Sequence, residues 1–77
     1  MTQEEYCAVA YRLGHDYARK RLGAGNGPDS VRLAMQSAQE HLQELKAYSV
    51  GLDAMMCLGV EDALAGKPMD RRYATPR

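Results

Sequence analysis

Residues 30–66, SVRLAMQSAQEHLQELKAYSVGLDAMMCLGVEDALAG, decide the fold, because they read as helix throughout except at Gly51 and Gly59. Apolar and small residues recur along this stretch at alternating steps of four and three, which is the pattern of a heptad seam. The members of the seam are Val31, Met35, Ala38, Leu42, Leu45, Ser49, Leu52, Met56, Gly59 and Ala63. The phase continues through both glycines, so the pattern favours one long helix over residues 30–65.

The alternative is a break or a kink within residues 49–52, where two poor helix formers precede Gly51. Glycine and Ser/Gly pairs are recognised kink sites, so a continuous helix is expected to bend there. Continuity gives an all-α helical hairpin with a short first helix and a long second one. A break gives three helices, and the third can then fold back onto the first within one chain.

The residues before this stretch carry clear signals for a first helix over residues 3–22. Thr2 and Glu5 have the spacing of a capping box. Gly23 suits a left-handed stop, and residues 23–29, GAGNGPD, predict a loop. An apolar stripe runs along this helix with a strip of small residues beside it. The stripe is Tyr6, Val9, Ala10, Leu13 and Tyr17, and the strip is Ala10, Gly14 and Ala18.

These elements predict one helical domain over residues 1–66, followed by a basic C-terminal tail over residues 67–77. A first helix of about 20 residues covers only about 30 Å of a continuous second helix that would be about 54 Å long. The apolar remainder should be covered by another chain, so we expect a homodimeric helical bundle. The expected partner or dimer interface is Tyr11, Leu45, Tyr48, Leu52, Met55, Met56 and Gly59.

The composition limits the classes of function. Ten basic and ten acidic side chains cancel, so no overall field draws the chain to nucleic acid or to an anionic membrane. No apolar run approaches the roughly 20 residues that span a bilayer, and the acidic start does not resemble a secretory signal. Two cysteines cannot form a dense disulfide framework. We therefore expect a cytoplasmic protein with free thiols and no membrane partner.

The residue types that carry chemistry do not form a recognisable site. Cys7, His15, His41 and Cys57 are the available soft metal ligands, but they lack the paired short spacings of a zinc site. We expect the thiols to act as small apolar side chains and the histidines to lie at or near the surface. The pattern predicts no catalytic residue, no cofactor and no metal.

A non-enzymatic protein–protein interaction module is therefore the leading expectation, acting as a regulator or inhibitor that binds a larger protein complex. An antagonist of a host defence complex, encoded by a phage or mobile element, would fit the small size and the lack of chemistry. The alternative is a small dimeric nucleic-acid-binding protein that uses the basic end of the first helix and the basic tail. Its contacts would come from Arg12, Arg19, Lys20, Arg21, Arg71 and Arg72.

Overall fold

The computed structural model describes residues 2–43 and 50–75, leaving out the side chains of residues 42, 43 and 50. Within these residues the chain is all-α, as predicted, with three main helices and a short fourth one. None of the described helices is long and apolar enough to cross a bilayer. The helices are α1 (Gln3–Gly23), α2 (Pro28–Gln43), α3 (Val50–Leu64) and α4 (Arg71–Ala74).

Local signals explain where α1 begins and ends. Thr2 Oγ1 accepts a hydrogen bond from the Glu5 amide at 3.2 Å, and Glu5 Oε1 accepts one from the Thr2 amide at 3.3 Å. This reciprocal pair is the capping box that the sequence predicts. Beyond the helix, Gly25 has a φ of +94°, which a residue without a Cβ adopts at little cost. Pro28 then begins α2, where its missing N–H is not needed.

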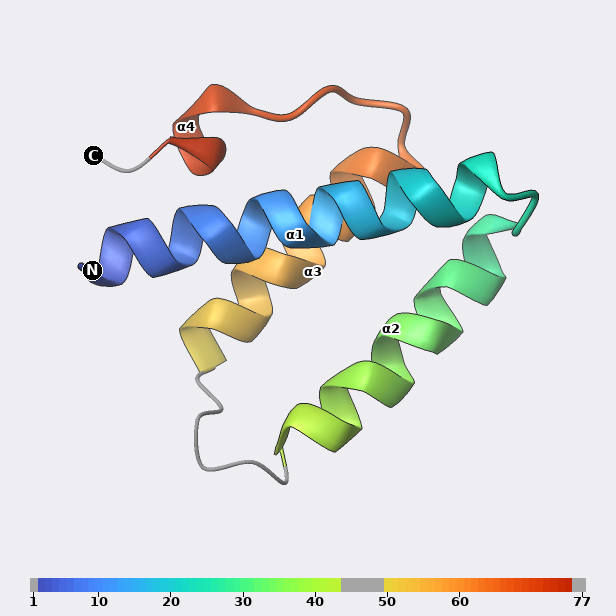
Figure 1. Ribbon diagram of the computed structural model, residues 1–77, viewed down its shortest axis with the longest axis horizontal. Coiled ribbons are helices and arrows are strands. Elements are labelled where there is room, and N and C mark those ends of the chain that lie inside the picture. Colours follow the sequence, from blue (N-terminus) through green and yellow to red (C-terminus); the bar gives the residue numbers. More distant parts are fainter. Residues whose placement is uncertain (1, 44–49, 76–77) are drawn as a thin grey trace.

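The second predicted helix is not continuous. α2 and α3 run in different directions, and α3 returns behind α1 instead of extending α2 (Figure 1). The preferred prediction of one helix over residues 30–65 is therefore wrong, and its three-helix alternative is confirmed. Gly51 lies inside α3, so it is not the joint. Residues 44–49, between the two helices, lie outside the described part of the chain.

Close packing of α1 on α3 explains why the chain turns back. A Cβ on Gly14 would collide with the backbone of Met56, and a Cβ on Gly59 would collide with the carbonyl of Tyr11. The two glycines therefore let the helix backbones approach closely. Folding α3 onto α1 buries apolar surface on both helices, whereas a continuous helix would leave that surface of α3 exposed.

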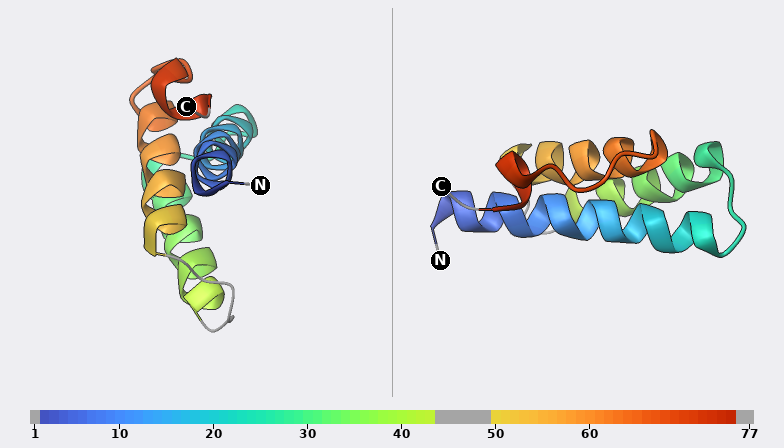
Figure 2. Two further views of the ribbon diagram at one scale, coloured as in Figure 1. Left: turned by 90° about the vertical axis from the view of Figure 1, so that its left-hand side faces the viewer. Right: turned by 90° about the horizontal axis from the view of Figure 1, so that it is seen from above.

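The helices form two layers, with α1 in one and α2 and α3 in the other (Figure 2). The Cα positions span 35 × 30 × 14 Å, so the molecule is flat. α2 contributes to the core mainly through its first half, because Val31 and Met35 are buried whereas Ala38 is exposed. The main core cluster consists of Ala18, Val31, Met35, Val60 and Ala63, with Tyr17, Leu22, Met56 and Leu64 packed against it.

The C-terminal segment folds back along α1. Gly66 ends α3 with a φ of +75°, and the chain then follows the edge of α1 that lies opposite α2 (Figure 1). The side chain of Asp70 accepts a hydrogen bond from the Arg72 amide at 2.9 Å and so caps α4. α4 packs on α1, so the tail predicted over residues 67–77 is, as far as residue 75, part of the folded unit.

Candidate functional site

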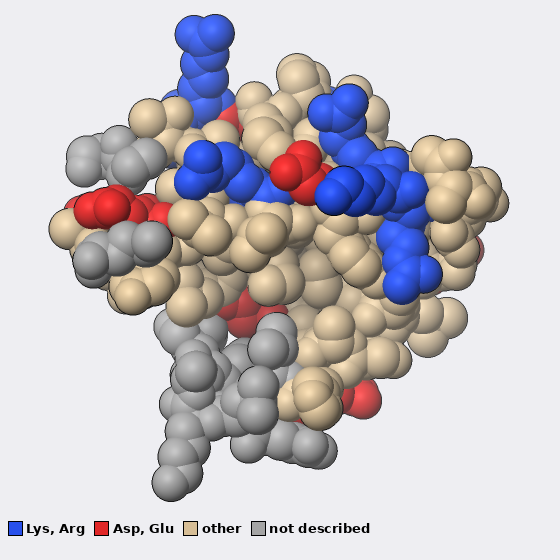
Figure 3. Space-filling model, in the orientation of Figure 1, with Lys and Arg blue, Asp and Glu red and all other residues tan. Residues whose placement is uncertain are grey.

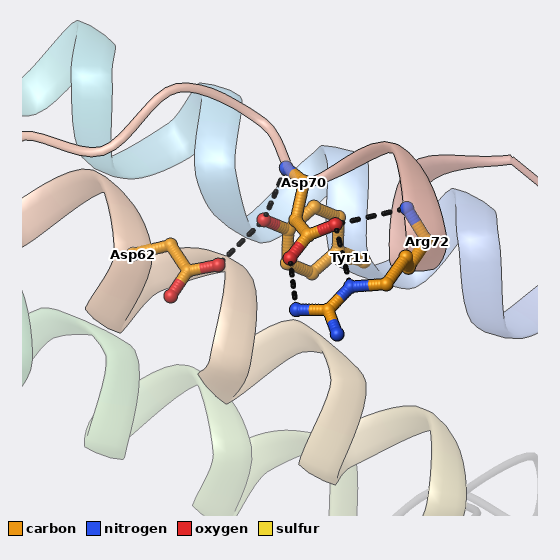
Figure 4. Close-up of polar contacts among 4 residues, drawn as sticks. All are labelled: Tyr11, Asp62, Asp70 and Arg72. Carbon is orange, nitrogen blue, oxygen red and sulfur yellow. Dashed lines mark hydrogen bonds and ion pairs between the residues drawn. The ribbon is translucent and has the colours of Figure 1, made fainter.

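A buried tyrosine joins α1, α3 and the C-terminal segment. Tyr11 is 0% exposed, and its hydroxyl donates to Asp62 Oδ2 at 2.6 Å and accepts from the Asp70 amide at 2.9 Å (Figure 4). Asp70 Oδ2 in turn accepts from Arg72 Nη2 at 2.9 Å. The ring of Tyr73 lies 5.6 Å from that of Tyr11. These contacts hold the C-terminal segment against the two main helices.

The electrostatics of this network suit a structural role. Desolvation raises the pKa of Tyr11, and the hydrogen bond to Asp62 raises it further. The hydrogen bond from Arg72 holds the pKa of Asp70 below its ordinary value. Tyr11 is therefore a neutral donor and Asp70 a charged acceptor at neutral pH. Neither shift moves a pKa toward neutrality, which a general acid or base requires.

His15, which we expected near the surface, is fully buried on α1. Its Nε2 lies 2.8 Å from the carbonyl oxygen of Lys67, so Nε2 carries the proton and donates it to this hydrogen bond. None of the described residues offers a hydrogen bond to Nδ1. The imidazole connects the segment after α3 to α1, much as Tyr11 connects the segment before α4.

Cys57 lies on α3 beside polar side chains from two helices. The side-chain amide of Gln39 donates to Cys57 Sγ and, at 2.8 Å, to Asp53 Oδ1. Burial raises the pKa of the Cys57 thiol, and the negative charge of Asp53 adds to this effect. An activated thiol has the opposite shift. In residues 2–43 and 50–75, no group of three His, Cys, Asp or Glu side chains is arranged to hold a metal ion.

One side of α1 lies away from α3 and the C-terminal segment, except at Tyr17, which packs against the core cluster. At about 100° per residue, Tyr6, Val9, Leu13 and Tyr17 share this side of the helix, and we call them the α1 ridge. Tyr6 is 49% exposed and Leu13 is 57% exposed, while Val9 and Tyr17 are half-buried. α1 therefore turns its small residues toward α3 and leaves larger apolar residues uncovered.

Most of the interface residues predicted from the sequence lie within the fold itself. Tyr11 and Gly59 are buried between α1 and α3, so they pack within the chain itself. Leu52, Met55 and Met56 are half-buried on α3, the helix that packs on α1 of the same chain. Two further members of the predicted set lie outside the described residues: Leu45 and Tyr48.

The residues predicted to contact nucleic acid form two separate groups. Figure 3 shows Lys and Arg side chains gathered over the C-terminal half of α1. The members of the set on α1 are all exposed: Arg12, Arg19, Lys20 and Arg21. The other two, Arg71 and Arg72, belong to α4, which lies near the N-terminal half of α1 (Figure 1). The structure therefore does not bring the basic end of α1 and the basic tail together.

No family model, curated protein or solved structure matches this chain. The candidate site therefore rests on geometry, which singles out the α1 ridge. Tyr6 and Leu13 are not among the interface residues predicted from the sequence, although the stripe that contains them is visible there. The strip of small residues beside the stripe is the signal that could have identified them, because close backbone packing through that strip turns the stripe outward.

Proposed function

We propose that this protein is a non-catalytic protein-interaction module whose binding surface is the α1 ridge. The proposal is carried by the exposure of Tyr6 and Leu13 on a helix whose opposite side is packed against α3. Apolar side chains aligned along one side of a helix fit a helix–helix contact or a hydrophobic groove. A regulator or inhibitor that occupies a surface of a larger protein complex acts through such a contact.

The titratable side chains support a binding role over a catalytic one. The hydrogen bonds of three of them join the C-terminal segment to the helices: Tyr11, His15 and Asp70. Cys57 has a raised thiol pKa, which lowers its thiolate fraction at neutral pH. Tyr6 and Leu13 of the α1 ridge, in contrast, stay about half exposed in the described part of the chain. Contact with another protein would bury them.

Affinity capture with a tagged chain tests this proposal when the wild type is compared with Leu13→Asp. We expect the substitution to abolish capture of protein partners, because the contact would desolvate the new carboxylate. Leu33→Asp is the matched control, since Leu33 is 65% exposed on the side of α2 away from buried Val31 and Met35. It should capture the same partners as the wild type. The same partners captured by Leu13→Asp at wild-type yield would exclude the α1 ridge as the binding surface.

Nucleic-acid binding is a second candidate function, favoured by the exposed cations over the C-terminal half of α1 (Figure 3). The chain has no net charge, so any attraction to phosphates would be local to this face. Binding of the wild-type chain to generic DNA or RNA that weakens steeply with salt would favour this candidate. Absence of binding at low salt would remove it.

A further inference from the structure

We propose that the occupant of the α1 ridge is a second copy of this chain, with the two α1 helices packed antiparallel about a two-fold axis near Leu13. The inference rests on the proposed function, because it names the partner of the same surface. In such a contact the same side chains serve both copies. Leu13 then meets its own copy, and Val9 of each chain meets Tyr17 of the other.

The charges of α1 determine the antiparallel orientation. Glu4 and Glu5 lie in the first turn of the helix, and Lys20 and Arg21 lie in the last turn. With the axis near Leu13, the acidic end of each helix lies beside the basic end of the other copy. A parallel pair would place like charges together at both ends, which disfavours association. The helix macrodipole, positive at its N-terminus and negative at its C-terminus, favours the same orientation.

The uncovered surface extends from α1 onto α2. Ala38 is exposed, although it lies on the same side of α2 as the buried Val31 and Met35. Tyr17, at the C-terminal end of the α1 ridge, packs against the core cluster that contains these two residues. The ridge and this side of α2 therefore meet at one end, and each continues outward from the core without a partner in the described chain.

Sedimentation velocity of the full chain at micromolar concentration tests this inference. We expect the wild type and Leu33→Asp to sediment as dimers. Leu13→Asp should raise the dissociation constant on the order of 100-fold or more and sediment as a monomer, because two unpaired carboxylates would face each other at the axis. Leu13→Ala, which adds no charge, should weaken the dimer by a smaller factor. Circular dichroism of each variant confirms that it is folded.

A wild-type chain that sediments as a monomer would overturn the inference and leave the proposed function to the affinity-capture experiment. If that experiment then finds a different protein bound through Leu13, the α1 ridge is the binding surface for that protein and not for a second copy of the chain. A wild-type dimer that withstands both Leu13→Asp and Leu13→Ala would also overturn the inference, because its interface would lie elsewhere on the chain.

Discussion

Gly14→Ala should lower the free energy of unfolding by about 2–3 kcal/mol, because the added methyl group meets the backbone of Met56. A backbone carbonyl cannot rotate away as the end of a flexible side chain can, so α1 has to move away from α3. The better helix propensity of alanine offsets only about 1 kcal/mol of the clash. The measurement is urea denaturation followed by circular dichroism. A domain of this size has only about 4–12 kcal/mol of stability in total.

The chain offers a close control for this effect. Gly23 also lies in α1, and none of the described residues would come within 4 Å of a Cβ placed there. Gly23→Ala should therefore be neutral or stabilising by up to about 1 kcal/mol. Gly59→Ala should destabilise as Gly14→Ala does, since its Cβ would meet the carbonyl of Tyr11 and the amide nitrogen of His15. Wild-type stability in Gly14→Ala would mean that the two helices do not approach closely.

Tyr11→Phe should lower the free energy of unfolding by about 1–3 kcal/mol at neutral pH, because it leaves Asp62 and the Asp70 amide without their shared partner. The loss should appear in urea denaturation together with faster proteolysis of the C-terminal segment, since Tyr11 connects that segment to α1. Tyr73→Phe removes a hydroxyl from a half-buried ring and should change stability by less than about 0.5 kcal/mol. Equal losses in the two variants would contradict the role assigned to the Tyr11 hydroxyl.

The same substitution should change how stability depends on alkaline pH. The pKa of Tyr11 in the folded chain lies above its ordinary value of 10.0, first through desolvation and then through the hydrogen bond to Asp62. The unfolded chain therefore loses this proton before the folded chain does. The stabilisation is complete below the unfolded pKa and is lost as the pH rises through the folded pKa. The stability difference between wild type and Tyr11→Phe should thus shrink above about pH 10, and a constant difference would refute this linkage.

The ends of α1 could be predicted because their signals are local. Thr2 and Glu5 are three residues apart, and the glycine-rich loop marks the turn without reference to the rest of the chain. The left-handed residue is Gly25, however, and not Gly23 as predicted, because Gly23 is still part of α1. The break between α2 and α3 could not be predicted in the same way. The alternating spacing of four and three residues along residues 30–65 keeps its phase whether this stretch forms one helix or two. The information that separates these cases lies in the contact of Gly14 and Gly59 with the opposite helix, which exists only after folding.

The sequence predicts the apolar stripe that contains the candidate site, but it does not predict which side of α1 faces α3 and which side is exposed. The sequence shows both the apolar stripe and the small-residue strip of α1, and burying the larger apolar residues usually contributes more free energy. The structure uses the strip instead, because it allows close backbone packing and lets Tyr11 and His15 bond to the returning C-terminal segment. Tyr11 therefore belongs to the core, and Leu13 belongs to the surface. No local pattern contains these long-range hydrogen bonds.

Disulfide formation between single introduced cysteines tests the antiparallel pairing of two α1 ridges most directly. The background for this experiment is a chain whose Cys7 and Cys57 are replaced by alanine. Leu13→Cys should give a covalent dimer under mild oxidation, because a disulfide requires Cα atoms within about 7 Å of each other. Tyr6→Cys should not, since its two copies would be about 21 Å apart at ~1.5 Å per residue. Mixing Tyr6→Cys with Lys20→Cys should give a covalent heterodimer. Efficient covalent dimers of Tyr6→Cys alone, or no covalent dimer of Leu13→Cys, would contradict antiparallel pairing of the α1 ridges.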